Sequence, residues 1–209
     1  DGEVERALAD FRDRDAVVAN ISALAIPDTE ENWYTSFEVD LMHTVRLAKA
    51  AIPHLEGSGQ GSIVAVSSVS GRESDAVSGP YGTMKTAIVG YVSGLAMQLA
   101  GRGVRANVVS PGNTYFPDGF WQGVERGDPE LFASALALNP TGRMGTAEEM
   151  ARAVVFLSSP VSSFTTGTVI PGPPQNAARC SGSVKACQTR SLGALTTRET
   201  VSSPRRSSL

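Results

Sequence analysis

Tyr81 and Lys85 lie four positions apart and together could move a proton. On a helix, this spacing places both side chains on one face. A free tyrosine has a pKa of about 10, but a nearby ammonium favours the phenolate and lowers that pKa. Such a pair can transfer a proton to or from an alcohol or carbonyl oxygen. With 4 tyrosines and three lysines in the chain, chance gives this spacing about 6% of the time, so its position in the fold must support it.

Two hydroxyl side chains, Ser67 and Ser68, follow an apolar run that ends shortly before this pair. In an open parallel sheet, ligands bind at the carboxyl ends of the strands. A hydroxyl at that place could hold the oxygen on which Tyr81 acts. The next apolar run, 104–109, ends in the turn Pro111-Gly112, which would lie at the same edge.

Apolar runs rich in β-branched residues alternate with helical patterns along the chain. Strands that are apolar on both faces and separated by helices predict a parallel sheet covered by helices, so the class is α/β. The long central helix is expected to end before Pro53, and the aromatic stretch 113–138 gives no clear element. Strands are predicted at 16–20, 62–67, 104–109 and 166–170, and helices at 2–11, 28–52, 78–100 and 146–157.

These motifs together resemble the short-chain dehydrogenase/reductase family over about residues 1–170. Tyr81-Gly-Thr-Met-Lys85 is similar to its Tyr-x-x-x-Lys motif, and Ser68 lies thirteen residues before Tyr81, at the usual family spacing. The resemblance implies a doubly wound, Rossmann-like parallel sheet. Further matches are the strand and Pro-Gly turn at 104–112, and the C-terminal signature at 143–151, 156–157 and 166–167.

The resemblance implies an oxidoreductase that transfers a hydride between NAD or NADP and an alcohol or ketone. Tyr81 would be the general acid/base, Lys85 would lower its pKa and hold the nicotinamide ribose, and Ser68 would bond the substrate oxygen. No metal is expected, because His43 and His54 lack partners at ligand spacing. The residues implied to bind the cofactor are Asn20, Tyr81, Lys85, Pro111, Gly112 and Thr114.

Two segments near this site depart from the family pattern. The family's Asn-Asn-Ala-Gly reads Ala19-Asn20-Ile21-Ser22, which keeps one Asn but is bulkier. Asp40 stands where the family usually has a catalytic Asn, whose backbone carbonyl holds a water in the proton relay. We expect Asp40 to keep that catalytic role. The alternative is a capping or solvated helix acid.

The glycine-rich loop of a dinucleotide fold lies between a strand and a helix. The glycine-rich run 57–61 instead precedes a strand, so it is expected to be a plain turn. In the family, the cofactor loop lies upstream of the position of Asp1. We therefore expect an incomplete sheet with roughly strands 4 to 7 of the family. The alternative function is a non-catalytic fragment that lacks the cofactor-binding half.

Composition divides the chain near residue 170. With 41% hydrophobic residues the chain can bury a core, and a net charge of −3 argues against a nucleic-acid partner. Residues 171–209 carry six basic side chains and one acidic side chain, with no apolar periodicity. We expect a partial catalytic domain at 1–170 and a disordered tail at 171–209.

The change of pattern at Pro171 falls where a family strand should finish. We hypothesise that the tail is read out of frame, with a basic interaction tail as the rival interpretation. Coding DNA in which no other frame restores a Val-Asp-Gly-like continuation would exclude the hypothesis.

The expected partner is a small alcohol or ketone; a hydroxysteroid, a 3-oxoacyl thioester and a small sugar alcohol all stay open. Helices 29–51 and 80–100 correspond to the family's dimer interface, so a homodimer or homotetramer is expected for the complete protein. The aromatic stretch 113–132 fits a substrate lid or core packing equally well.

The sequence also bears on location. No apolar run reaches the roughly 18–20 residues of a membrane span, and no signal peptide opens the chain. The two cysteines, Cys180 and Cys187, form no disulfide framework, so a cytoplasmic location is expected.

Overall fold

The computed structural model describes residues 15–73, 75 and 79–173. The chain divides into two units, 1–176 and 177–209. The predicted helix 2–11, both cysteines and nearly all of the predicted tail lie outside the described residues. The domain boundary near residue 170 therefore stays a prediction.

A parallel sheet forms the centre of the first unit, with its four strands in the order β1-β2-β3-β4. The register pairs Val18 of β1 with Val64 of β2, and Val64 in turn with Asn107 of β3. The predicted α/β class with a Rossmann-like sheet is confirmed. The strands are β1 (Ala16–Ala19), β2 (Gly61–Val66), β3 (Val104–Ser110) and β4 (Val169–Pro171).

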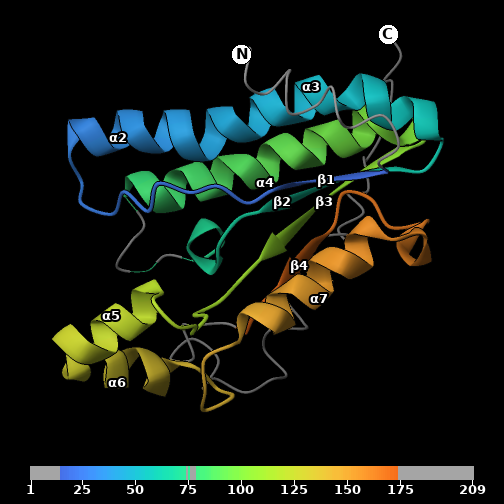
Figure 1. Ribbon diagram of the computed structural model, residues 1–209. Helices are drawn as coiled ribbons and strands as arrows, with labels where there is room; N and C mark the ends of the chain where they lie inside the picture. Colours follow the sequence, from blue (N-terminus) through green and yellow to red (C-terminus); the bar gives the residue numbers. More distant parts are fainter. Residues whose placement is uncertain (1–14, 74, 76–78, 174–209) are drawn as a thin grey trace, which may run out of the picture. The chain divides into compact units, whose positions relative to one another are not determined.

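Helices cover both faces of this sheet, as Figure 1 shows. One face carries α3 (His43–Ser58) and α4 (Pro80–Leu99), and the other carries α7 (Ala147–Ser158). β3 is buried along its whole length, as expected for a strand covered on both faces, and its buried polar side chains Arg105 and Asn107 are hydrogen-bonded. Two further helices, α5 (Phe120–Gly127) and α6 (Pro129–Leu138), lie beyond the carboxyl end of β3 (Figure 1).

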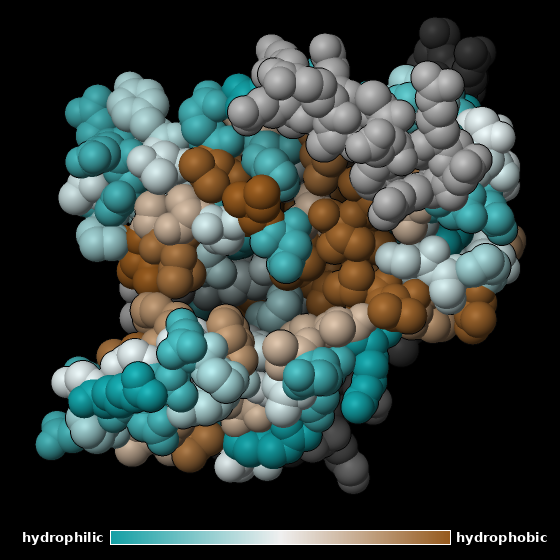
Figure 2. All heavy atoms as spheres, viewed as in Figure 1, coloured by the Kyte–Doolittle hydropathy of each residue, from teal (hydrophilic) through white to brown (hydrophobic). Residues whose placement is uncertain are grey.

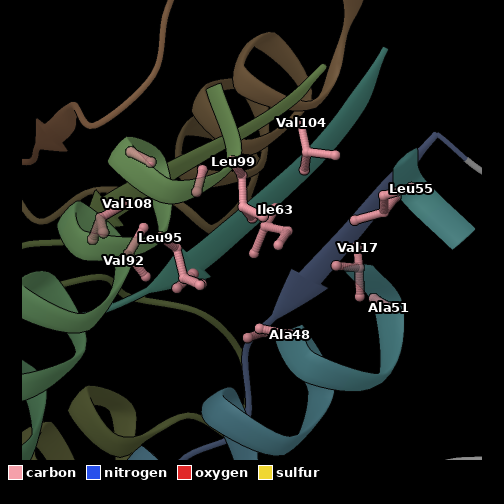
Figure 3. Close-up of a cluster of buried hydrophobic side chains, with 14 of the residues drawn as sticks. Val17, Ala48, Ala51, Leu55, Ile63, Val92, Leu95, Leu99, Val104 and Val108 are labelled. Carbon is pink, nitrogen blue, oxygen red and sulfur yellow. The ribbon is translucent and has the colours of Figure 1, made fainter. Parts of the chain in front are cut away.

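The main core lies between the sheet and the pair α3–α4 (Figure 3). Its side chains are aliphatic, and Leu55, Ile63 and Leu99 are all but completely buried. Burying each such side chain contributes about 1.5–3 kcal/mol. A smaller cluster of Val64, Val109 and Leu157 joins the sheet to α7.

The long helix of residues 28–52 is three consecutive segments: α2 (Glu30–Ser36), the π-helical turn η1 (Phe37–Met42) and α3. The expected end before Pro53 is wrong, since α3 continues to Ser58 and ends at Gly59 with φ 70°. Pro53 removes one backbone hydrogen bond, but the extra turn buries Leu55 against β2 and β3. Within the described ranges, no helix has the length and apolar character that crossing a membrane requires.

Candidate active site

Ser68 and Tyr81 meet at the carboxyl end of β2. Ser68 follows that strand and caps the short 3-10 helix η2 (Val69–Gly71), because its Oγ accepts a hydrogen bond from the Ser70 amide at 3.2 Å. Tyr81 lies in the first turn of α4, directly after Pro80, which is suited to a helix start. Tyr81 and Ser68 line the same cavity, close enough that the Ser68 hydroxyl lowers the pKa of the Tyr81 phenol.

Close contacts fix α4 against the end of β2. Ser67 Oγ donates to the Lys85 carbonyl at 2.7 Å, and Thr86 Oγ1 donates to the Gly71 carbonyl at 2.9 Å. A Cβ on Gly71 would lie 2.7 Å from the Lys85 carbonyl carbon, so only glycine permits this approach. The sequence patterns did not reveal that Gly71 and Thr86 set the distance between Ser68 and the Tyr81–Lys85 helix.

Lys85 is a buried cation beneath Tyr81. It is 2% exposed, and its Nζ lies 5.5 Å from the centre of the Tyr81 ring. The Nζ contacts Asp40 Oδ1 at 3.2 Å and the Val66 carbonyl at 3.5 Å. The Tyr81 side chain and the Lys85 ammonium therefore share one face of α4, as the four-residue spacing predicts.

Asp40 lies in the π-helical turn η1 and is completely buried. Its backbone carbonyl accepts a hydrogen bond from Thr44 Oγ1 at 3.0 Å. Its Oδ1 accepts another from Ser22 Oγ at 2.5 Å, so both Ser22 and Lys85 contact this carboxylate oxygen. π-helical turns occur often at functional sites, but no sequence signal used above predicts one.

The pKa of Tyr81 is raised, whereas from the sequence we expected the Lys85 ammonium to lower it. Burial raises the pKa of Tyr81, the hydrogen bond from Ser68 opposes this, and the carboxylates of Asp40 and Asp75 raise it further. Burial lowers the pKa of Lys85, whereas Asp40 raises it. The ammonium is thus paired with a carboxylate, and the neutral phenol is the favoured form of Tyr81.

The predicted cofactor-binding residues lie around the same edge of the sheet. Asn20 directly follows β1, and Pro111 follows β3, where its carbonyl accepts a hydrogen bond from the Val69 amide at 2.8 Å. Thr114 Oγ1 donates to the Gly112 carbonyl at 3.0 Å. Gly112 lines one cavity together with Ser68 and Tyr81, whereas Asn20, Pro111 and Thr114 do not line it.

This cavity has a volume of about 340 Å³ and a largely apolar wall. Its wall includes Phe120 and Trp121 of α5, Leu131 of α6 and Leu24 of the loop after β1. Phe120 and Trp121 pack edge to face at 5.3 Å. The aromatic stretch therefore builds part of the cavity wall beside Tyr81, in two helices that the sequence patterns did not predict.

The donor set fits the nicotinamide end of a dinucleotide. A buried ammonium, a phenol and a hydroxyl converge where ligands bind in open α/β sheets. The hydroxyl of Ser110, at the carboxyl end of β3, is buried and has no hydrogen-bond partner within the part of the chain that the structure describes. The glycine-rich run 57–61 precedes and enters β2 at its amino end, away from these groups, as its interpretation as a plain turn requires.

Comparisons with known proteins show which family this chain resembles. Residues 3–171 match the family described as enoyl-(acyl carrier protein) reductase. Isoepoxydon dehydrogenase of Penicillium expansum is 37% identical over 155 residues, which are 74% of this chain and 60% of that protein. A cis-4-hydroxycyclohexanecarboxylate dehydrogenase of Sinomonas cyclohexanicum is 32% identical over 174 residues, covering 80% and 67%. The chain thus spans only 60% of the length of the first of these relatives.

Solved structures share the fold. An oxidoreductase of the short-chain dehydrogenase/reductase family from Burkholderia thailandensis superposes with a TM-score of 0.76 at 28% identity, covering 91% of this chain and 74% of that one. A 3-oxoacyl-[acyl-carrier protein] reductase with bound NAD from Brucella melitensis gives 0.68 at 27% identity, covering 80% and 64%. By sequence match and by fold, this chain belongs to the short-chain dehydrogenase/reductase family.

Proposed function

We propose that this protein is an NAD(P)-dependent oxidoreductase that interconverts an alcohol and a ketone, with Tyr81 as general acid/base. The observation that carries this proposal is that Tyr81 and Ser68 lie together at the wall of an apolar cavity, with the buried Lys85 ammonium 5.5 Å from the Tyr81 ring centre. A phenol, a hydroxyl and an ammonium placed together in this way are suited to proton transfer to or from a substrate oxygen.

In this mechanism the substrate oxygen lies between two hydroxyls. Ser68 donates a hydrogen bond to that oxygen, and Tyr81 donates its proton as the carbonyl is reduced or accepts one as the alcohol is oxidised. NAD(P)H or NAD(P)⁺, when bound, supplies or accepts the hydride. Lys85 holds the nicotinamide ribose and stabilises the Tyr81 phenolate that remains after proton donation.

The cavity favours a substrate with an apolar body. Its wall of leucine and aromatic side chains suits a ring or a short hydrocarbon better than a sugar alcohol. Of the relatives compared, the one from Sinomonas cyclohexanicum is named for a hydroxylated cyclohexane ring. A cyclic secondary alcohol and its ketone are therefore the substrate pair we propose to test first.

We further propose that the complete protein is a homodimer or homotetramer joined through α2–α3 and α4. Trp33, Tyr34 and Phe37 are large side chains exposed on this helix layer, as is Met97 of α4. A cytoplasmic location is also proposed, on the basis of the cysteine content alone.

The test of the proposed function is a fluorescence titration of the chain with NADH and with NADPH. Saturable binding that is weakened by Lys85→Met, but not by Lys49→Met on the exposed side of α3, is the expected result. If neither nucleotide binds, the alternative of a non-catalytic chain without cofactor affinity replaces the proposal.

A further inference from the structure

The buried Asp40 carboxylate and the exposed Ser22 hydroxyl form a contact that the proposed function does not use. The Asp40 carboxylate is 0% exposed, and its Oδ1 contacts both Ser22 Oγ and Lys85 Nζ, at 2.5 and 3.2 Å. Its Oδ2 is buried without a hydrogen-bond partner among the described residues. A carboxylate is seldom buried in this way unless it is paired with a cation.

The backbone determines which group of Asp40 faces Lys85. In the turn η1 the Asp40 carbonyl is hydrogen-bonded to the Thr44 hydroxyl at 3.0 Å. The carboxylate, by contrast, points to the Lys85 ammonium, whose other acceptor is the Val66 carbonyl at 3.5 Å. The contact with Lys85 therefore belongs to the Asp40 side chain.

Ser22 and Asp40 come from different elements and differ from the family pattern together. Ser22 lies in the loop after β1, eighteen residues before Asp40, at the position where the resemblance places a glycine. A glycine there has no hydroxyl to donate, and an asparagine in place of Asp40 has no charge to pair with Lys85. The two changes complement each other, because the serine donates to the carboxylate that the aspartate introduces.

Three other titratable groups lie around the Asp40–Lys85 ion pair and Tyr81: Tyr81 itself, Asp75 and His43. Tyr81 lies over Lys85 on α4, Asp75 adds negative charge near Tyr81, and His43 follows η1 on α3. Burial and the Lys85 charge lower the pKa of His43, while Asp40 raises it. Asp40 also raises the pKa of Tyr81 and of Lys85. The buried Asp40 carboxylate thus raises the pKa of three side chains: His43, Tyr81 and Lys85.

We propose that Asp40 and Ser22 are positioning residues: the Ser22 hydroxyl orients the Asp40 carboxylate, which holds the Lys85 ammonium in place beneath Tyr81. The Asp40 side chain, and not its backbone carbonyl, is the group that acts on Lys85. The catalytic meaning of this arrangement rests on the proposed function, but the arrangement itself is measurable without substrate or cofactor.

The first experiment titrates Tyr81 in the full chain by NMR with ring-labelled tyrosine, assigned with Tyr81→Phe. Asp40→Asn removes a negative charge and leaves Lys85 as an unpaired cation, and both changes favour the phenolate. The Tyr81 midpoint is therefore expected to shift to lower pH. Glu38→Gln is the matched control, since Glu38 is in the same turn but pairs with Arg46 at the surface, and it should leave the midpoint unchanged.

The second experiment measures how fast the Lys85 ammonium protons exchange with water, on ¹⁵N-lysine-labelled chain. Exchange should be slowest in the unmodified chain, faster in Ser22→Ala and fastest in Asp40→Asn. The double variant should match Asp40→Asn alone, because Ser22 acts only through Asp40. Ser36→Ala, which removes a buried hydroxyl one turn before Asp40, should have no effect.

An unchanged Tyr81 midpoint in Asp40→Asn would overturn the role of the carboxylate, and unchanged Lys85 exchange in Ser22→Ala would overturn that of Ser22. If circular dichroism shows that Asp40→Asn does not fold, the Ser22→Ala and Ser36→Ala pair decides. Failure of the proposed function is a separate result, since it shows as absent NAD(P)H binding while Tyr81 and Lys85 still respond to Asp40.

Discussion

At the scale of single residues, the centre of the site is the Lys85 ammonium, which is paired with the Asp40 carboxylate. Lys85 and Asp40 form a buried ion pair, so removing either side chain would leave the other as an uncompensated buried charge. The hydroxyls of Ser68 and Tyr81 lie above this pair at the cavity wall. The phenol is thus held neutral in the folded chain, ready to donate a proton to a carbonyl oxygen.

We expect Tyr81→Phe to abolish this proton donation while leaving the fold intact. Loss of a general acid typically lowers kcat about 10²–10⁴-fold. Tyr91→Phe is the matched control, because Tyr91 is on the same helix but its hydroxyl only reaches the Val45 carbonyl at 3.5 Å. The assay is reduction of cyclic ketones followed by NAD(P)H absorbance. Equal activity in the two variants would contradict the role of Tyr81.

Spacing and strand-end position predicted that Ser68, Tyr81 and Lys85 would lie together, but of the other predicted site residues only Gly112 lines the cavity. Ser68 and Tyr81 line the same cavity. Lys85 lies beside Tyr81 because side chains four residues apart share a helix face. The partner of Asp40 could not be predicted in the same way. The Ser22–Asp40 contact joins a loop to a helix across eighteen residues, and the sequence patterns gave no sign of it.

At the scale of helices and strands, the apolar pattern of the sequence predicted the strands more closely than the helices. Continuous apolar runs located β1, β2 and β3 to within a residue or two, and the Thr146–Glu149 capping box marked the start of α7. The π-helical turn η1 escaped prediction because it interrupts a helix whose apolar spacing continues through it, and no residue type marks such a turn. The helices α5 and α6 escaped because they are short, with 8 and 10 residues, and α5 contains two glycines, which are poor helix formers.

The start of α7 gives a prediction for acid stability. Arg143 pairs with both carboxylate oxygens of Glu149, at 2.8 and 2.6 Å, and lowers the pKa of Glu149 from 4.5 to about 2. A carboxyl with a lowered pKa contributes stability above its unfolded pKa, and this contribution is lost as pH falls from 4.5 towards 2. Acid should therefore destabilise α7 over this range.

Glu149→Gln keeps an acceptor for the capping box but removes the charge. We expect its unfolding temperature to be lower than that of the unmodified chain at pH 7, with the difference disappearing as pH falls to 2. Thermal unfolding followed by circular dichroism at several pH values measures this. Glu148→Gln, an exposed change in the same turn, should show no such convergence; a constant difference for Glu149→Gln would contradict the ion-pair explanation.

At the scale of the whole first unit, the two faces of the sheet are covered unequally. Val17 and Ala19 of β1 are buried on the side of α3, but Val18, on the opposite face, is 40% exposed. Its register partner Val64 is completely buried, together with Val109 and Leu157, so the α7 side of the sheet is closed over β2 and β3 and open at β1. Figure 2 shows apolar side chains gathered between the α2–α3 layer and α7, where β1 runs in Figure 1.

This open edge predicts self-association of the chain. Among the described residues, β1 pairs with β2 alone, so its other edge presents unpaired backbone groups beside an apolar side chain. Val18→Lys places a charge at that edge and should raise the concentration at which the chain associates at least about tenfold, a change of about 1.4 kcal/mol. Sedimentation velocity over a concentration series measures it. Val161→Lys, at a position 82% exposed and outside the sheet, is the matched control. The edge explanation requires that only Val18→Lys changes association, because a lysine elsewhere adds the same charge without blocking strand pairing.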